Sequence, residues 1–295
     1  MENAANQNIP ISKVQKQGPF VIMFKQLRKN TGAMIGLYVF GLLVLLAIIA
    51  PFIAPYDYKA INVPVANSSP SLAHLAGTDQ VGRDIFSRLL IGARYSLTLG
   101  VMATLIGTVI GVFFGCLAGY FGGTTDEVIM RITDIFQSIP GMVLNVALAC
   151  AIGVGFWKTI FVLSVPGIAG SARLIRAQIL KIRTMEYIEA ADVINCSHSK
   201  TIVKHLLPNA FSPILVNMTM RIGGSIMAAA GLSYLGLGVL PPTPELGAML
   251  ADGRNYLTKY PYMCIFPGIF IIITVLSLNL FGDGLRDALD PKLKK

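Results

Sequence analysis

The chain has 295 residues, of which 54% are hydrophobic and only 13% are charged, and its mean hydropathy is +0.65. These values exclude an ordinary soluble domain, in which about a quarter of the residues are charged. The net charge of +9 does not indicate nucleic-acid binding, because the basic residues are scattered between apolar runs. The composition therefore predicts an all-α integral membrane protein.

The N-terminal part of the chain predicts a tail followed by a membrane span. We expect residues 1–31 to form a cytoplasmic tail and residues 32–55 to hold the first transmembrane helix. The apolar run at 33–54 contains 13 Leu, Ile, Val and Phe residues, which contribute about 4–8 kcal/mol towards insertion. The run begins too late and is too long to be the core of a signal peptide.

Residues 56–93 are polar and rich in turn-forming residues, which predicts an extracytoplasmic loop before the second span. The loop contains a motif of charges and glycines, whose members are Gly77, Thr78, Asp79, Gly82, Arg83 and Asp84. We expect a turn at the glycines and salt bridges that order the loop, rather than catalysis.

Residues 94–284 are expected to form a core of five further transmembrane helices. The predicted spans are residues 96–121, 141–156, 159–172, 211–237 and 263–281. The second and third of these are short for a hydrocarbon core about 30 Å thick, so they must borrow flanking residues or lie within protein. In the first of these spans, small residues recur every four positions from Ala103 to Gly119. This ridge predicts a close helix contact, either within the subunit or across a dimer.

Arg221 lies well inside the apolar run at 211–237. An arginine at the bilayer centre costs about 2.5–3.5 kcal/mol on insertion scales. Arg221 must therefore face a partner, a cavity or the lipid headgroups. A place in a translocation pathway and snorkelling both remain open.

The stretch at 187–213 reads YIEAADVINCSHSKTIVKHLLPNAFSP and predicts two short helices. Glu186, Glu189 and Asp192 recur every three residues, so they lie near one another on the first helix. Asn195 suits the left-handed conformation that ends a helix.

The second helix is expected to follow this turn. Ser197 or Ser199 can cap it, and it runs through Lys204 until Pro208 and Pro213 close it. Two such helices between membrane spans have nothing of their own to bury against. They therefore indicate either a solvated loop or a segment that inserts into a partner.

The same stretch resembles the coupling loop of permease subunits in ATP-binding-cassette (ABC) importers, whose pattern EAA…G…LP fits without a gap. Within the coupling loop at 185–209, the candidate residues are Glu189, Ala190, Ala191, Asp192, Asn195, Ser197, Leu207 and Pro208. The family usually has Gly where this chain has Asn195, which tolerates the same backbone region. Residues 77–97 are similar to the segment before the second span in the dipeptide, oligopeptide and nickel branch of these permeases.

The resemblance implies the type I ABC importer permease fold, with six transmembrane helices and a cytoplasmic coupling helix. It implies a transport subunit, not an enzyme, that forms half of a path for di- or oligopeptides, with nickel or another small solute as the alternative. The implied partners are a second homologous permease in a heterodimer, two ABC ATPase subunits that bind ATP and Mg, and an extracytoplasmic binding protein. No cofactor is expected in this chain. Glu189, Ala190 and Ala191 would dock on an ATPase, and Asn195 would set the turn angle.

The Lys and Arg residues of the loops predict the orientation in a bacterial cell membrane. With six spans, one side holds sixteen of these residues and the other holds seven. The richer side should be cytoplasmic. Both termini, including a tail at 285–295, and the coupling loop are therefore expected inside.

Two other function classes fit the sequence less well. The string nearest to a nucleotide-binding motif, at 153–159, lacks the Gly before Lys, so energy must come from another chain. A secondary transporter needs ionisable groups near the membrane centre, where only Arg221 qualifies. An intramembrane serine protease needs a base for Ser233, but no His lies in any predicted span.

The sequence has no paired His residues that could bind a metal and no CxxC motif, so the cysteines are expected to be ordinary thiols.

Overall fold

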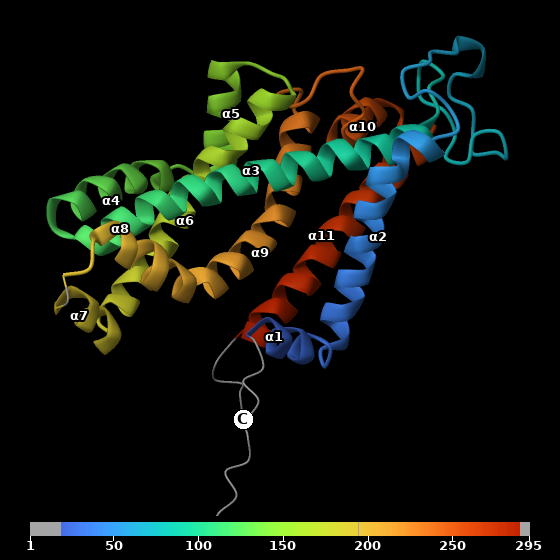
Figure 1. The fold of residues 1–295 in the computed structure, drawn as a ribbon. Helices are drawn as coiled ribbons and strands as arrows, with labels where there is room; N and C mark the ends of the chain where they lie inside the picture. The colour runs from blue at the N-terminus through green and yellow to red at the C-terminus, as the bar shows by residue number, and fades with distance from the viewer. Residues whose placement is uncertain (1–18, 194, 290–295) are drawn as a thin grey trace, which may run out of the picture.

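The computed structural model of the protein describes residues 19–193 and 195–289, which fold into helices and connecting loops (Figure 1). The helices are α1 Pro19–Leu27, α2 Thr31–Ile53, α3 Ile85–Phe121, α4 Gly123–Ser138, α5 Gly141–Ile152, α6 Phe156–Arg183, α7 Glu186–Val193, α8 His198–Thr201, α9 Leu207–Tyr234, α10 Leu246–Gly253 and α11 Tyr262–Leu289. Short 3-10 turns lie at Val63–Val65 and Arg254–Tyr256, and a π-helical segment, Ile202–Leu206, joins α8 to α9.

Five helical stretches are long and apolar enough to cross a membrane, namely α2, α3, α6, α8 with α9, and α11. The helices α4 and α5, which are bent by 93° relative to one another, bring the number to six if the pair counts as one span. The predicted all-α membrane fold is confirmed.

The two short runs reach the length of a span only together with flanking residues, one of the outcomes that the sequence predicts, although the bounds of the helices differ from the predicted ones. The run at 159–172 belongs to α6, whose 28 residues are long enough to span the hydrocarbon core alone. The run at 141–156 is not a separate span, because α5 has only 12 residues and forms a bent pair with α4. The bend lies at Pro140, which has no N–H to donate and holds Ile139 in an extended conformation.

The helix α3 begins inside the loop predicted at 56–93. It starts at Ile85, because the Asp84 carboxylate caps it by accepting a hydrogen bond from the backbone N–H of Ser87. Its 37 residues give α3 a length of about 55 Å. At the ends of the chain, α1 lies within the predicted N-terminal tail and α11 extends to Leu289, whereas residues 1–18 and 290–295 lie outside the described residues.

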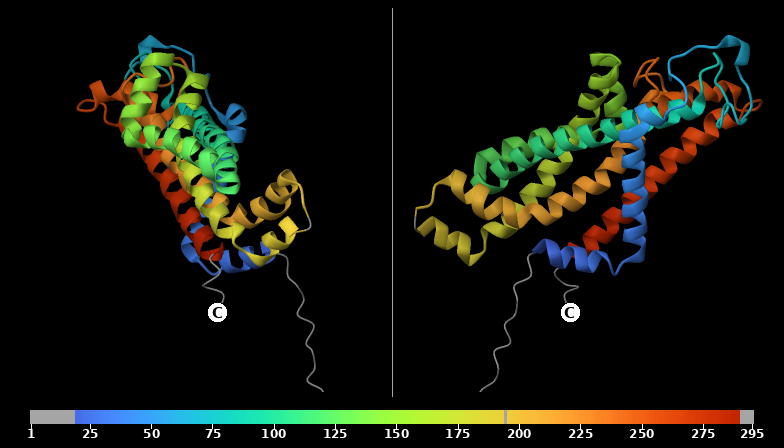
Figure 2. Two further views of the ribbon diagram at one scale, coloured as in Figure 1. Left: turned by 90° about the vertical axis from the view of Figure 1, so that its left-hand side faces the viewer. Right: turned by 45° about the vertical axis from the view of Figure 1, so that its right-hand side comes forward.

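The helices α3 and α6 run side by side, with glycines of α3 against the backbone of α6 (Figures 1 and 2). A Cβ atom added at Gly107 would lie 2.9 Å from the carbonyl oxygen of Ser164, and one at Gly111 would lie 2.5 Å from Cβ of Ser171. Further along, Gly115 and Gly119 meet α6 in the same way. The predicted small-residue ridge therefore packs within the subunit, where close approach of the two backbones maximises dispersion contacts.

The long axis of α3 separates two groups of elements (Figures 1 and 2). The loop at 56–84 and α10 lie at its N-terminal end, and α4, α7 and α8 lie at its C-terminal end. The helices α9 and α11 touch around Gly223 and Gly282 and then diverge towards the end of α11 that packs against α1.

We expect Gly111→Ala to lower the stability of the protein by about 1–3 kcal/mol, because the new methyl group forces α3 and α6 apart. The measurement is the midpoint of thermal unfolding of the full chain in detergent. The matched control is Gly224→Ala in α9, where an added Cβ atom meets nothing within 4 Å. Equal midpoints for the two variants would show that the ridge does not determine the packing.

Candidate functional site

The predicted docking residues belong to helix α7, and they are Glu189, Ala190, Ala191 and Asp192. Their side chains lie outside the described part of the structure, so their role stays a prediction. The turn after α7 is as predicted, because Asn195 has a φ of 55°, in the left-handed region. Asparagine reaches this region at a lower energetic cost than other side-chain-bearing residues.

The second predicted helix does not end at its prolines, contrary to the prediction. The helix α8 passes through the π-helical segment into α9, with Pro208 in the first turn of α9 and Pro213 inside it. Proline is tolerated in the first turn of a helix, and a π-helical turn changes the hydrogen-bond register just before it. Ser197 precedes α8 in an extended conformation, as expected for an N-cap, but its hydroxyl makes no capping hydrogen bond.

The coupling segment (residues 185–209) is buried in part against its own chain, which also differs from the prediction. Ile188 and Leu206 are 1% and 0% exposed, in an apolar cluster with Tyr120 and Ile179 at the ends of α3 and α6. The Tyr120 hydroxyl lies 2.8 Å from Nδ1 of His198 at the start of α8. A displacement of this segment must therefore move the ends of α3 and α6 with it.

We expect Asn195→Gly to leave the coupling segment intact and Asn195→Val to disrupt it. Glycine adopts a positive φ without strain, whereas a β-branched side chain in this region is strained by roughly 1–3 kcal/mol. The measurement is limited proteolysis at 185–209 in membranes, with the wild type as reference. Equal cleavage of the two variants would contradict a constrained turn.

A largely buried charge cluster (Asp79, Arg83, Arg88 and the half-buried Asp252) joins the loop at 56–84 to α3 and α10. Nε of Arg83 donates to Asp79 at 2.6 Å, as predicted, and Arg83 and Arg88 each approach Asp252 at 3.6 Å. Arg88 is only 2% exposed, and its Nη1 lies 3.7 Å from Asp79. Arg88 and Asp252 were not among the predicted residues, because no local pattern in the sequence links α10 to this loop.

The other residues of the predicted loop motif shape the turn beside the cluster. Gly77 and Gly82 have positive φ angles, and a Cβ atom at Gly82 would lie 1.8 Å from the carbonyl oxygen of Asn62. Thr78 donates its hydroxyl to the backbone of the same loop. Asp84 pairs with His74 at 2.9 Å and caps α3. These contacts order the loop.

In this cluster, the free-energy cost of removing charged groups from water is opposed by the attraction between their opposite charges. Burial raises the pKa of the Asp252 carboxyl above its ordinary value, and the positive charges of Arg88 and Arg83 oppose that rise. Ions that are removed from water are stabilised only when their partners are close and well placed. Removal of one member therefore leaves the others insufficiently paired.

We expect Arg88→Met to destabilise the protein by about 3–5 kcal/mol, the usual effect of breaking a buried ion pair. The control is Arg131→Met, whose pair with Glu127 on α4 has side chains that are 75% and 69% exposed and should contribute at most about 1 kcal/mol. Thermal unfolding in detergent measures both. Similar shifts would show that burial does not strengthen the cluster.

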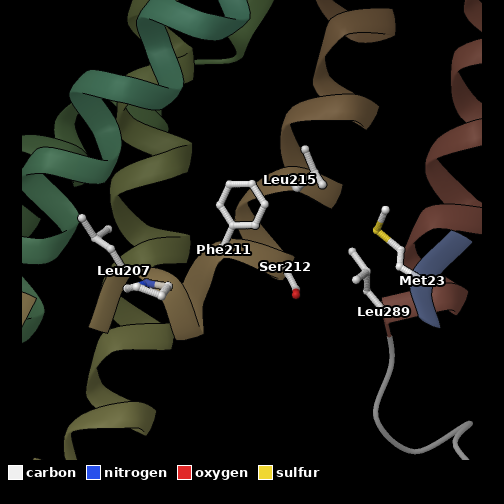
Figure 3. A pocket seen from close by; sticks show the side chains of 7 residues that line it. Met23, Leu207, Phe211, Ser212, Leu215 and Leu289 are labelled. Carbon is white, nitrogen blue, oxygen red and sulfur yellow. The ribbon is translucent and has the colours of Figure 1, made fainter. Parts of the chain in front are cut away.

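Arg221 lies in the middle of α9 and faces α6. Its Nη1 donates to the carbonyl oxygen of Gly167 at 3.0 Å and lies 3.5 Å from Oγ of Ser171. The structure thus places Arg221 against protein, whereas Leu207 and Pro208 line an apolar recess near the start of α9 (Figure 3). A role for Arg221 in transport stays a prediction at this point.

Residues 111–295 match the family described as the binding-protein-dependent transport system inner membrane component. The chain belongs to this family. Residues 18–70 of this permease match the N-terminal transmembrane domain of oligopeptide transport permease C. The resemblance seen in the sequence is confirmed.

Two relatives of the permease are similar over most of both chains. It is 42% identical to the oligopeptide transport system permease protein OppC of Bacillus subtilis (strain 168), over 91% of this chain and 88% of that protein. It is 43% identical to the glutathione transport system permease protein GsiD of Escherichia coli O6:K15:H31, over 99% of this chain and 97% of that protein.

Solved structures of two ABC transporters share the fold of the permease. An inward-facing MetNI methionine ABC transporter superposes with a TM-score of 0.57 at 23% identity, over 70% of this chain and 98% of that chain. An amino acid ABC transporter with histidines gives 0.54 at 16% identity, over 70% and 95%. The permease therefore has the fold of the type I ABC importers.

Proposed function

We propose that this permease forms half of the translocation pathway of an ATP-driven importer of di- or oligopeptides. The proposed substrate class rests on the similarity of nearly the whole chain to permeases named for oligopeptide and glutathione transport. The proposed mechanism rests on the attachment of the coupling segment to the ends of α3 and α6.

The proposed partners follow from this role. A second homologous permease completes the pathway in a heterodimer, and two ATPase subunits, which bind ATP and Mg, dock on the coupling segment. An extracytoplasmic binding protein delivers the peptide at the end of α3 that carries the loop at 56–84. This chain is proposed to hold no cofactor and to catalyse no reaction. Both termini and α7 face the cytoplasm, because that side carries sixteen of the Lys and Arg residues.

The proposed transport cycle uses the coupling segment as a lever. Closure of the ATPase pair on ATP displaces α7 and α8. Because α8 continues into α9 without a break, and because Tyr120 and Ile179 tie the segment to α3 and α6, three spanning helices move together. Such a displacement produces a rigid-body transition between inward- and outward-facing states.

We expect Glu189→Arg to abolish ATP-dependent peptide uptake and to reduce the ATPase activity that co-purifies with the tagged permease. If Glu189 contacts a positively charged or hydrogen-bond-donating group of the ATPase, an arginine at this position repels that group or leaves it unpaired. The control is Glu127→Arg, the same reversal at an exposed position on α4. Wild-type uptake by the Glu189 variant would exclude the role assigned to this residue. Uptake of nickel but not of peptides by the wild type would redirect the substrate assignment.

A further inference from the structure

Arg221 lies between spanning helices that contain no acidic residue. It is the fifteenth of the 28 residues of α9, and α3, α6 and α9 contain neither Asp nor Glu. The neighbouring α11 carries Asp283 and Asp287, but the hydrogen bonds of Arg221 within the described residues go to α6 alone. Its charge is therefore compensated by a backbone carbonyl and not by a carboxylate.

The surface of α6 beneath the guanidinium is made of glycines. A Cβ atom at Gly167 would lie 2.6 Å from Nη2 of Arg221, and one at Gly170 would lie 3.0 Å from Nη1. The hydrogen bond from Nη1 to Gly167 fixes the orientation of the group. Among the described residues no hydrogen bond engages Nε or Nη2, and neither atom belongs to the fully buried unpartnered set. One edge of the guanidinium thus keeps two free donors.

A partly polar recess lies beside the turn of α9 that precedes Arg221, with Asn217 and Met220 of that turn among its lining residues. It has a volume of about 430 Å³ and lies between α6, α9 and α11, with Gln178, Ser212, Asn217 and Arg286 among its lining residues. Asn217 precedes Arg221 by four residues and therefore shares its side of α9. The helices that line the recess include the two that hold Arg221.

The recess exists because α9 and α11 diverge. On the other side of the same gap, an apolar recess of about 520 Å³ separates Ser212 and Leu215 of α9 from Met23 and Leu289 (Figure 3). Ser212 and Leu289 line both recesses. A solute between α9 and α11 therefore meets the polar groups of one recess and the apolar side chains of the other.

We propose that the Nε and Nη2 donors of Arg221 bind the C-terminal carboxylate of a peptide as it passes between α6 and α9. The planar fork of arginine matches a carboxylate with two parallel hydrogen bonds, and these strengthen away from water. Arg286, which lines the recess, carries the same sign of charge and attracts an anionic group there. This inference rests on the proposed import of peptides and adds the group by which the permease holds them.

The test uses the complete importer in vesicles and one tripeptide as the free acid and as the C-terminal amide. The tripeptide is one that the binding protein holds in both forms, as measured by calorimetry. We expect the wild type to import the acid faster than the amide, and Arg221→Gln to reduce acid uptake roughly tenfold to a hundredfold with amide uptake unchanged. Arg221→Lys should keep part of the preference.

Two further variants separate binding from folding. Gly167→Ala displaces the guanidinium without removing its charge, and it should lower the acid-to-amide ratio in an assembled complex. Lys158→Gln, at an exposed position at the start of α6, is the control for loss of a positive charge and should keep the ratio. An equal acid-to-amide ratio in wild type and Arg221→Gln overturns this inference alone. The absence of ATP-dependent uptake of either peptide by the wild type overturns the proposed function with it.

Discussion

The close packing of α3 on α6 is the contact on which the rest of the structure depends. In lipid there is no hydrophobic driving force between helices, so association relies on dispersion contacts that need short backbone distances. Glycines from Gly107 to Gly119 provide them along four successive turns of α3. This contact also fixes the rotation of α6, and therefore the direction in which Gly167 and Ser171 face α9.

Because α3 is a single helix of about 55 Å, it connects two polar ends of the molecule. At its start, Arg88 joins the buried charge cluster and Asp84 caps the first turn. At its end, Tyr120 contacts His198 of the coupling segment. A rigid helix anchored at both ends transmits a displacement without absorbing it, which suits the proposed movement of the subunit.

Arg88 and Arg221 are stabilised in different ways. Arg88 lies within 4 Å of two carboxylates, whose charges oppose the cost of its burial. Arg221 has a backbone carbonyl of α6, and two of its donors have no hydrogen-bond partner among the described residues. A cation of the first kind holds elements together, whereas one of the second kind retains the capacity to bind an anion. The divergence of α9 from α11 leaves a recess beside the turn of α9 that precedes Arg221.

The sequence by itself determined the membrane class, most of the spans, the small-residue ridge, the left-handed turn at Asn195 and the pairing of Asp79 with Arg83. Each of these features depends on the composition of the chain or on the spacing of residues a few positions apart, and both can be read from the sequence. Only the tertiary structure decided that the ridge meets α6, that Asp252 completes the charge cluster and that α8 continues into α9. It also decided that Arg221 faces Gly167. These contacts join residues far apart in the chain, and they depend on how each helix is rotated against its neighbours, which the periodicity of one helix does not specify.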